Sequence, residues 1–333
     1  MSVWVVGIIF LIVKLLVVLV ALLLFAAYLI YVERRLLGFL QLRLGPNRAG
    51  PLGLLQPIAD AVKLLTKEDV MPAGVDRVIF LYAPVVVAAT AILIFAVVPF
   101  AQGWTFRGHP IPGVVTDLNV GLLYVYALSS LAVYGVALGG WASNSKYSLL
   151  GAIRGAAQMI SYELALGLSL VPIVMMAKSF SLVDIVNAQA RWPFILFQPV
   201  AFVIFFVSSL AEMKRIPFDI PEAEHELIAG YHTEYSGMRF GLFFLGEYVT
   251  MVTLGALVAV FFLGGWRGPF LPPLLWFLIK VSAVVLVIIW IRGTLGRLRY
   301  DQLMHLGWKL LIPMALLNII VTGGALLALG YKV

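Results

Sequence analysis

The stretch LIVKLLVVLVALLLFAAYLI, residues 11–30, decides the fold. Lys14 is the only charged residue among these twenty. An α-helix needs about 20 consecutive apolar residues to cross the hydrocarbon core of a bilayer. This stretch therefore predicts a membrane-spanning helix, and the rest of the chain can be interpreted around it.

The remainder of the sequence has the same character. Of the 333 residues, 62% are apolar and only 12% are charged, whereas soluble domains carry about 25% charged residues. Continuous apolar runs, without the short alternating segments of an outer-membrane barrel, predict an all-α bundle. We expect one transmembrane domain over residues 1–333, with about eight spans near 5–30, 78–100, 118–141, 153–177, 194–212, 240–263, 272–292 and 307–330.

Basic residues predict the orientation of the bundle. Sixteen of the 23 Lys and Arg residues fall in the loops after spans 1, 3, 5 and 7, and only five lie on the other side. The positive-inside rule places the richer side in the cytoplasm, or its organellar equivalent, and both termini outside. We expect a bacterial inner membrane rather than an organellar one. The formal charge of +7 has this explanation, and no basic run is long enough to indicate nucleic-acid binding.

The predicted cytoplasmic loops cover approximately 31–77, 142–152, 213–239 and 293–306. The first contains Leu54, Leu55, Ile58, Ala61, Val62 and Leu65 at helical spacing. This pattern predicts a short amphipathic helix that lies either on the bundle or on the membrane surface.

Some acidic residues lie in or at the end of predicted spans, where an ionised side chain raises the free energy of membrane insertion. Glu163 and Glu247 fall within predicted spans, and Glu212 lies at the inner end of span 5. An ionisable residue in a span usually faces a cavity, a partner or a proton path. One alternative is an ion pair between helices with Lys280, Arg154 or Arg292. Proton exchange is the hypothesis we prefer, since apolar surroundings and neighbouring carboxyls raise carboxyl pKa values.

The segment AEMKRIPFDIPEAEHELIAGYHTEYSG, residues 211–237, concentrates further carboxylates. Asp219 and Glu222 resemble a capping box and predict a helix that runs to Gly230, with Glu222 and Glu226 on one face. A solvated acidic loop is the simpler interpretation. Partial burial at an interface fits better, because apolar residues alternate with the acidic ones on the basic side of the membrane. The acidic residues of the segment are Glu212, Asp219, Glu222, Glu224, Glu226 and Glu234.

Several classes of site have no support. Cysteine is absent, which excludes disulfides, thiolate metal sites and iron–sulfur ligation in this chain. His225 and His232 have no further histidine or cysteine to complete a metal set. No serine occupies a nucleophile elbow, so hydrolase chemistry is not indicated.

Three segments resemble the family of membrane subunit 1 (the H subunit) of proton-pumping NADH:quinone oxidoreductase, respiratory complex I. They are ERRLLGFLQLRLGPNRAGPLGLLQPIADAVKLLTKED at 33–69, GWASNSKYSLLGAIRGAAQMISYE at 140–163 and RIPFDIPEAEHELIAGYHTEYSG at 215–237, and the tail RLRYDQLMHLGWK at 297–309 also fits. The resemblance covers nearly the whole chain, with the segments in the same order.

The resemblance implies a subunit of an oxidoreductase that couples quinone reduction to proton translocation but contains no complete catalytic site. Quinone, the substrate, enters from the lipid through this subunit and reaches a chamber shared with hydrophilic-arm subunits. FMN and iron–sulfur clusters, including the terminal one, are bound by those partners. Small membrane subunits and antiporter-like subunits are the expected membrane partners, and nucleic acid is not one.

The resemblance also assigns residues. Carboxylates matching the family's proton-coupling positions are Glu163, Glu212, Asp219, Glu222, Glu224, Glu226, Glu234 and Glu247. Positions matching the quinone path are Arg34, Arg35, Arg43, Phe218, Arg292 and Arg299. Two other classes stay open at this point. One is a membrane subunit of an energy-converting hydrogenase-type complex, which uses no quinone; the other is a stand-alone ion transporter.

Overall fold

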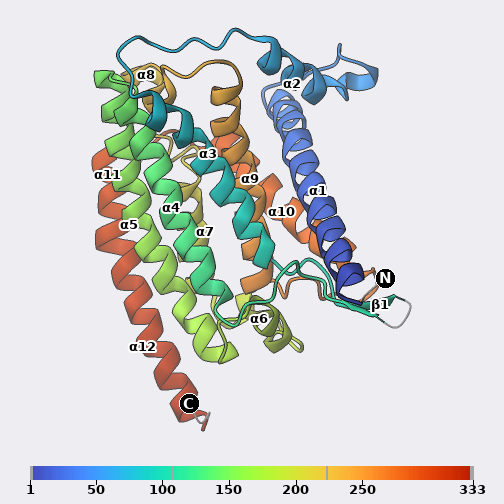
Figure 1. Ribbon diagram of the computed structural model, residues 1–333. Coiled ribbons are helices and arrows are strands. Elements are labelled where there is room, and N and C mark those ends of the chain that lie inside the picture. The colour runs from blue at the N-terminus through green and yellow to red at the C-terminus, as the bar shows by residue number, and fades with distance from the viewer. Residues whose placement is uncertain (1–2, 107–108, 223, 331–333) are drawn as a thin grey trace.

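The computed structural model describes residues 3–106, 109–222 and 224–330 and shows an all-α membrane bundle (Figure 1). Its helices are α1 (Val3–Leu40), α2 (Gln56–Thr66), α3 (Arg77–Ile94), α4 (Gly121–Ala142), α5 (Lys146–Ala177), α6 (Leu182–Ala188), α7 (Pro199–Glu212), α8 (Glu224–Leu227), α9 (Gly237–Phe262), α10 (Pro273–Thr294), α11 (Tyr300–His305) and α12 (Ile312–Ala328). Short 3-10 turns occur at Pro51–Gly53, Phe95–Val97, Phe194–Leu196 and Gly230–His232, and a π-helical turn, Leu306–Leu311, joins α11 to α12. A small antiparallel hairpin of β1 (Trp104–Phe106) and β2 (His109–Ile111) lies between α3 and α4 in the sequence.

Seven helical stretches in the described part of the chain are long and apolar enough to cross a membrane. They correspond to seven of the eight predicted spans. The predicted span 194–212 differs, because its helix α7 has only 14 residues, or about 21 Å at 1.5 Å per residue. The 3-10 turn and Pro199, which lacks a backbone N–H, delay the start of this helix.

Six helices form a closely packed unit, here called the body: α3, α4, α5, α7, α9 and α12. Small residues allow their backbones to approach, as is common between membrane helices. A Cβ on Gly135 of α4 would lie 2.5 Å from Val87 Cγ2 of α3. Tyr162 of α5 donates a hydrogen bond of 2.8 Å to the carbonyl of Leu303, which fixes α11 and the following helix to the body.

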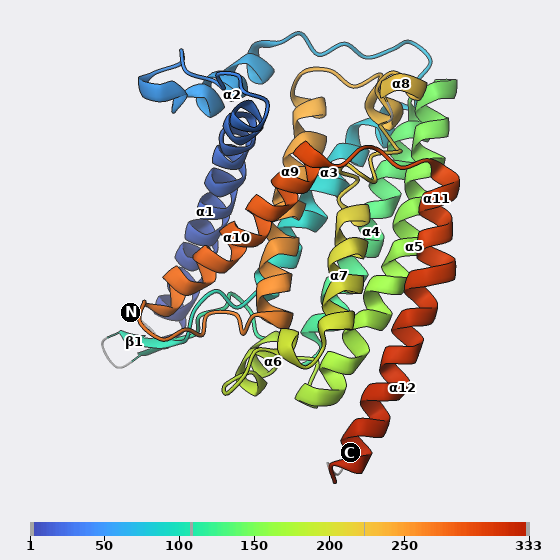
Figure 2. The same ribbon diagram turned by 180° about the vertical axis from the view of Figure 1, so that it is seen from behind.

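The helices α1, α2 and α10 form a second unit, here called the wing. Figure 2 shows α10 running obliquely between α1 and α9, and both neighbours contact it. The helix α1 continues to Leu40, whereas the sequence places the end of its span near residue 30. A large part of the apolar surface of the wing is uncovered, including Leu16, Val17 and Leu275.

The amphipathic helix predicted in the first loop is present as α2, and it contacts α1 and α9. Its predicted apolar face is exposed at Ile58, Val62 and Leu65. Leu64, outside the predicted stripe, lies beside Gly241 of α9. The helix therefore lies at the edge of the bundle with its apolar side free. The end of the bundle that carries α2 and α8 is called the α2 end below, and the opposite end, with α6 and the hairpin, the α6 end (Figure 1).

Candidate functional site

The acidic segment before α9 is fixed against α5 by close backbone contacts. Gln158, buried in α5, donates hydrogen bonds of 2.8 and 2.7 Å to the carbonyls of Ala211 and Phe218. Gly151 faces Gly230, and a Cβ on Gly151 would lie 2.8 Å from the Gly230 Cα. These contacts position the carboxylates of the segment over the packed body.

The predicted helix from 219 to 230 is wrong. Among the described residues of this range, the α-helix is limited to Glu224–Leu227, which is followed by the turn Gly230–His232. Gly230 has a φ of +60° and its Cα lies against the Pro221 carbonyl, so the chain folds back on itself instead of continuing as a helix. As a result Glu222 and Glu226 do not share a helical face.

Glu247 of α9 lies at the centre of a polar cluster at the α2 end. The hydroxyl of Tyr231 donates to Glu247 Oε1 at 3.1 Å and accepts from Lys214 Nζ, also at 3.1 Å. Tyr231 and Lys214 are buried. One hydroxyl thus connects a cation to a carboxylate within the protein, which is an arrangement suited to moving a proton or a charge.

Glu222 hydrogen-bonds to Glu247 from the other side. Because two ionised carboxylates have no proton to share, this contact needs one proton between them. Burial and the charge of Glu247 raise the pKa of Glu222 well above its ordinary value. His232 Nδ1 lies 3.9 Å from Glu222 Oε1.

Asp219 extends the cluster toward the end of α10. Its Oδ2 accepts a hydrogen bond of 2.7 Å from Arg297. Burial raises the pKa of Asp219 despite this arginine. The other carboxyl oxygen, Oδ1, is buried and has no hydrogen-bond partner among the described residues.

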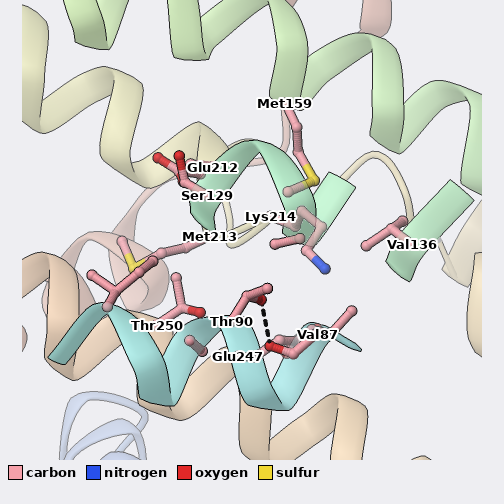
Figure 3. A pocket seen from close by; sticks show the side chains of 13 residues that line it. Val87, Thr90, Ser129, Val136, Met159, Glu212, Met213, Lys214, Glu247 and Thr250 are labelled. Carbon is pink, nitrogen blue, oxygen red and sulfur yellow. Dashed lines mark hydrogen bonds between the residues drawn. The ribbon is translucent and has the colours of Figure 1, made fainter. Parts of the chain in front are cut away.

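A second carboxylate group lies deeper in the bundle, between α4, α5 and α7. Glu163 Oε1 accepts hydrogen bonds from Ser129, at 3.0 Å, and from Ser130. Ser129 also hydrogen-bonds to Glu212, and Figure 3 shows these two side chains next to each other. A hydroxyl carries one proton, so Ser129 can donate to only one acceptor at a time.

Two small cavities border Glu212, and the first of them connects the two groups. The first, of about 30 Å³, is lined by Glu212, Lys214 and Glu247 among others (Figure 3). The second, of about 20 Å³, lies on the far side of Glu212 beside Tyr126 and Thr253, whose hydroxyls are buried without a partner in the described part of the chain. Each cavity is large enough for at least one water molecule with polar neighbours.

The ion-pair alternative from the sequence is not supported for Glu163, Glu212 and Glu247. Lys280 donates to three backbone carbonyls, Arg154 pairs with Glu226, and Arg292 pairs with Glu33. The three basic residues considered as partners are therefore engaged elsewhere.

A third cluster centres on Glu33 of α1, a residue that no sequence pattern singles out. Its side chain is 2% exposed and accepts hydrogen bonds from Arg215, at 2.8 and 3.0 Å, and from Arg292. Tyr248 adds a further hydrogen bond. Removal of one member of such a buried pair typically costs about 3–5 kcal/mol. The cluster joins α1 and α10 of the wing to the body.

The predicted quinone-path residues have different surroundings and do not form one cluster of contacts. Arg34 pairs with Asp60 at 2.8 Å, and Arg35 donates to the Tyr31 hydroxyl and the Leu52 carbonyl. Arg43 is exposed in the loop after α1. Of the others, Arg292 joins the Glu33 cluster, Phe218 is buried with its ring 5.5 Å from Tyr162, and Arg299 is exposed and pairs with Asp301.

The remaining predicted carboxylates lie outside the buried clusters. Glu226 is 63% exposed and pairs with Arg154, and Glu234 is half-buried in the turn before α9. The side chain of Glu224 lies outside the described part of the chain. Within that part, no group of three or more His, Asp or Glu residues is arranged to hold a metal ion.

Sequence reasoning also missed the groups that connect the carboxylates. In the sequence, none of these groups is a charged residue in the middle of an apolar span, so none stands out. They are Lys214, Tyr231, Ser129 and Ser130. A hydroxyl adjacent in the fold to Glu163 or Glu247 is separated from it by 16 to 34 positions in the sequence. The only signal in the sequence is at Lys214, which directly follows the apolar run of α7; its burial is seen only in the structure.

These features define the chain as a polytopic helical membrane protein with connected carboxylates in its interior. The model of the NADH dehydrogenase family matches residues 13–323. The second of the H subunits of NADH-quinone oxidoreductase in Syntrophobacter fumaroxidans is 69% identical over 98% of this chain and 99% of its own. The corresponding second H subunit of Geobacter sulfurreducens is 66% identical over 91% and 92%, and the H subunit of Syntrophotalea carbinolica 58% over 96% and 97%. The chain belongs to this family, that of the H subunit of NADH-quinone oxidoreductase.

Proposed function

We propose that this chain is the membrane subunit of an NADH:quinone oxidoreductase that forms the quinone entry path and part of the quinone chamber. In this role it couples quinone reduction to proton translocation through its buried carboxylates. The observation that carries the proposal is the connected row of Asp219, Glu222, Glu247, Glu212 and Glu163, bridged by hydroxyls and small cavities. The names of the relatives favour the quinone enzyme over a hydrogenase-type complex.

The proposed proton route starts at the acidic segment. A charge that appears near Glu222 shifts the balance of the proton shared with Glu247. The Tyr231 hydroxyl and Lys214 then respond, because they contact Glu247 directly or through one hydrogen bond. Water in the first cavity extends the route to Glu212, and Ser129 extends it to Glu163. The carboxylates proposed for proton coupling also include three further residues of the acidic segment: Glu224, Glu226 and Glu234.

The proposed quinone route uses the α2 end of the wing. Reduction of a quinone produces an anion that needs protons, so its path benefits from an apolar tunnel with cations at the mouth. Uncovered apolar surface on α1 and α2 meets Arg34, Arg35 and Arg43 there. Phe218, Arg292 and Arg299 complete the proposed route.

The proposed partners supply the redox groups. The chain has no cysteine to ligate an iron–sulfur cluster. In this proposal FMN and the iron–sulfur clusters belong to hydrophilic-arm subunits that dock at the α2 end, and small and antiporter-like membrane subunits join the chain in the membrane. We propose a bacterial inner membrane with the α2 end in the cytoplasm. A reporter at residue 60 or 224 should then read as cytoplasmic, and one at residue 109 or the C-terminus as external. A cytoplasmic C-terminus would contradict the orientation.

The decisive experiment separates electron input from proton coupling. Glu247→Gln and Glu163→Gln keep shape and most hydrogen bonds but cannot exchange a proton. In membranes that contain the assembled complex, we expect normal electron transfer from NADH to a hydrophilic acceptor. Quinone reduction and linked pumping should fall by roughly 10²-fold, the scale of a lost acid–base group.

The control is Glu68→Gln, which makes the same change at an exposed carboxylate of the same end. It should leave both activities unchanged. Normal pumping in the Glu247→Gln and Glu163→Gln variants would remove these residues from the route, and loss of assembly would indicate a structural role.

A further inference from the structure

A large pocket lies at the α6 end, away from the carboxylates. It has a volume of about 690 Å³ and is formed by residues at the end of α6, the turn after α9 and the start of α10. Arg191, Arg267 and Lys280 all line it, and none of the described residues that line it is acidic. On the side of the bundle with few basic residues, three cations therefore surround one pocket.

The charges of the pocket are held in place without carboxylates. Lys280 Nζ donates to the carbonyls of Leu263, Gly265 and Arg267, at 2.6, 2.9 and 2.6 Å. The guanidinium of Arg267 donates to Asn187 Oδ1 at 3.0 Å, and Arg191 is exposed. Carbonyl and amide oxygens satisfy donors but leave the net positive charge in place, so the pocket attracts an anion.

The two acidic residues nearest in sequence to the pocket do not neutralise it. Asp184, in α6, accepts a hydrogen bond of 2.8 Å from Ser179, and Asp117 accepts one of 2.9 Å from Ser181. Neither lines the pocket.

Two buried donors among the lining residues have no partner in the described part of the chain. They are Nε of Arg267 and Nε1 of Trp276. Buried N–H groups in folded proteins are nearly always hydrogen-bonded, so each of these indicates a missing acceptor. The Trp276 indole is closely packed, because a Cβ on Gly268 would lie 2.3 Å from its Nε1. An oxyanion in the pocket would supply acceptors to both groups and to Arg191.

An apolar groove adjoins this pocket. It has a volume of about 340 Å³ and is lined by apolar residues of α1, α9 and α10 and by Phe100. In the first turns of α10, Pro273, Trp276 and Lys280 line the cationic pocket, whereas Leu274, Phe277, Leu278 and Val281 line the groove. The two sites thus lie on adjacent faces of one helix, and Phe270, shortly before that helix, is 92% exposed.

We propose that this pair of sites binds one anionic phospholipid, with the phosphate headgroup in the cationic pocket and an acyl chain in the groove. The pocket supplies three cations and two unpaired donors for phosphate oxygens, and the groove supplies the apolar surface that an acyl chain covers. A free phosphate ion would use the pocket and leave the groove exposed. Only a lipid has both a phosphate for the pocket and an acyl chain for the groove.

The test measures lipid retained by the purified complex. The complex is purified in mild detergent, and its bound phospholipids are counted by native mass spectrometry. Arg191→Gln and the double variant Arg191→Gln/Arg267→Gln should retain phosphatidylglycerol roughly fivefold less for each cation removed. Lys178→Gln, which removes a cation from the same end outside the pocket, should retain as much as the unaltered complex.

Two further arms identify the ligand. Ala21→Phe, which places a ring in the groove and leaves every cation in place, should also lower retention of phosphatidylglycerol. Added phosphatidylglycerol vesicles should refill the site in delipidated complex, whereas phosphatidylcholine vesicles or inorganic phosphate should not. Equal retention in all variants, or displacement of the lipid by inorganic phosphate, would overturn the proposal. Arg191 is exposed, so its variant decides the matter even if the double variant fails to assemble.

Discussion

The body and the wing of the bundle bury their helices to very different degrees. In α9, at the centre of the body, 83% of the most apolar window is buried, whereas in α1 of the wing the figure is 11%. All the connected carboxylates from Glu163 to Glu247 lie in or against the body. Close packing is what makes this possible, because a polar group inside a membrane is tolerated only where neighbouring helices supply its partners.

The wing shows the opposite design. Many of its apolar side chains are uncovered, and its buried carboxylate, Glu33, is fully engaged by residues of α10 and of the segment after α7. The difference teaches that dense packing and buried carboxylates occur together in this bundle. Changes in the body should therefore be costly and changes in the wing mild.

The largest effect is expected where the acidic segment folds back on the body. Gly230→Ala places a Cβ 1.8 Å from the Pro221 carbonyl, at a φ of +60° that side chains rarely adopt. The segment must move, at a cost of about 3 kcal/mol or more. We expect little assembled complex on native gels and almost no quinone reduction.

The matched change in the wing is Gly293→Ala. Its Cβ would meet only the ends of the flexible Leu37 and Leu40 side chains, at 3.0 and 2.9 Å, and alanine favours a helix. The free energy of folding should be within about 1 kcal/mol of that of the unaltered chain, and the complex should assemble normally. An equal loss of assembled complex in both glycine variants would show that the body and the wing do not differ in their tolerance of substitution.

The next effect concerns the hydroxyl that joins Lys214 to Glu247. Tyr231→Phe keeps the ring packing and removes both hydrogen bonds of that hydroxyl. A charge-assisted hydrogen bond contributes about 1.5–3 kcal/mol, so quinone reduction should fall roughly tenfold. Steady-state assays in assembled complex measure this change. Tyr235→Phe, at another buried tyrosine of the body, whose hydroxyl donates to the Gly139 carbonyl, is the control and should stay near normal activity.

A smaller effect is expected in the wing at Arg43. Arg43→Ala should raise the apparent KM for quinone by about two- to fivefold, the effect of one surface cation, and leave kcat unchanged. Arg48→Ala, in the same loop, should not alter KM. An unchanged KM in the Arg43→Ala complex would argue against quinone entry at this loop.

The smallest effect is expected at Glu226. Its pair with Arg154 is exposed, and such surface pairs contribute about 0–1 kcal/mol. Glu226→Gln should change pumping by less than twofold in inverted vesicles. Glu226 is a proposed surface member of the coupling set, and water can take the place of an exposed carboxylate, so a loss comparable to that of Glu247→Gln would show that Glu226 is as necessary as the buried carboxylates.

The sequence predicts the helices better than it predicts their contacts. Long apolar runs and the spacing of Ile58, Val62 and Leu65 suffice for the spans and for α2, because these depend on local hydropathy and periodicity. The helix expected from Asp219 to Gly230 failed for a nonlocal reason. Its capping pattern and Pro221 are compatible with a helix start, but the backbone packs instead against Gly151 of a distant helix.

The site shows the same limit. Carboxylates in apolar spans could be selected one by one, since each is costly wherever it lies. Their partners could not, because Glu33 meets Arg292 across 259 positions and Glu163 meets Ser129 across 34. Such contacts depend on how whole helices pack, and no periodicity within one helix specifies them.

The shortness of α7 has an electrical consequence. Its 14 residues cover about 21 Å, less than a hydrocarbon core of about 30 Å; in the proposed orientation, with α7 beginning at the outer face of that core, Glu212 at its end would lie inside the layer across which the membrane voltage falls. With the α2 end in the cytoplasm, a proton that reaches Glu212 from Glu222 has crossed about a third of that layer. At 100 mV this displacement corresponds to roughly 0.7 kcal/mol. In the proposed proton route, a strongly energised membrane would therefore change the proton occupancy of Glu212 about threefold, and the shortness of α7 would make that route sensitive to the membrane voltage.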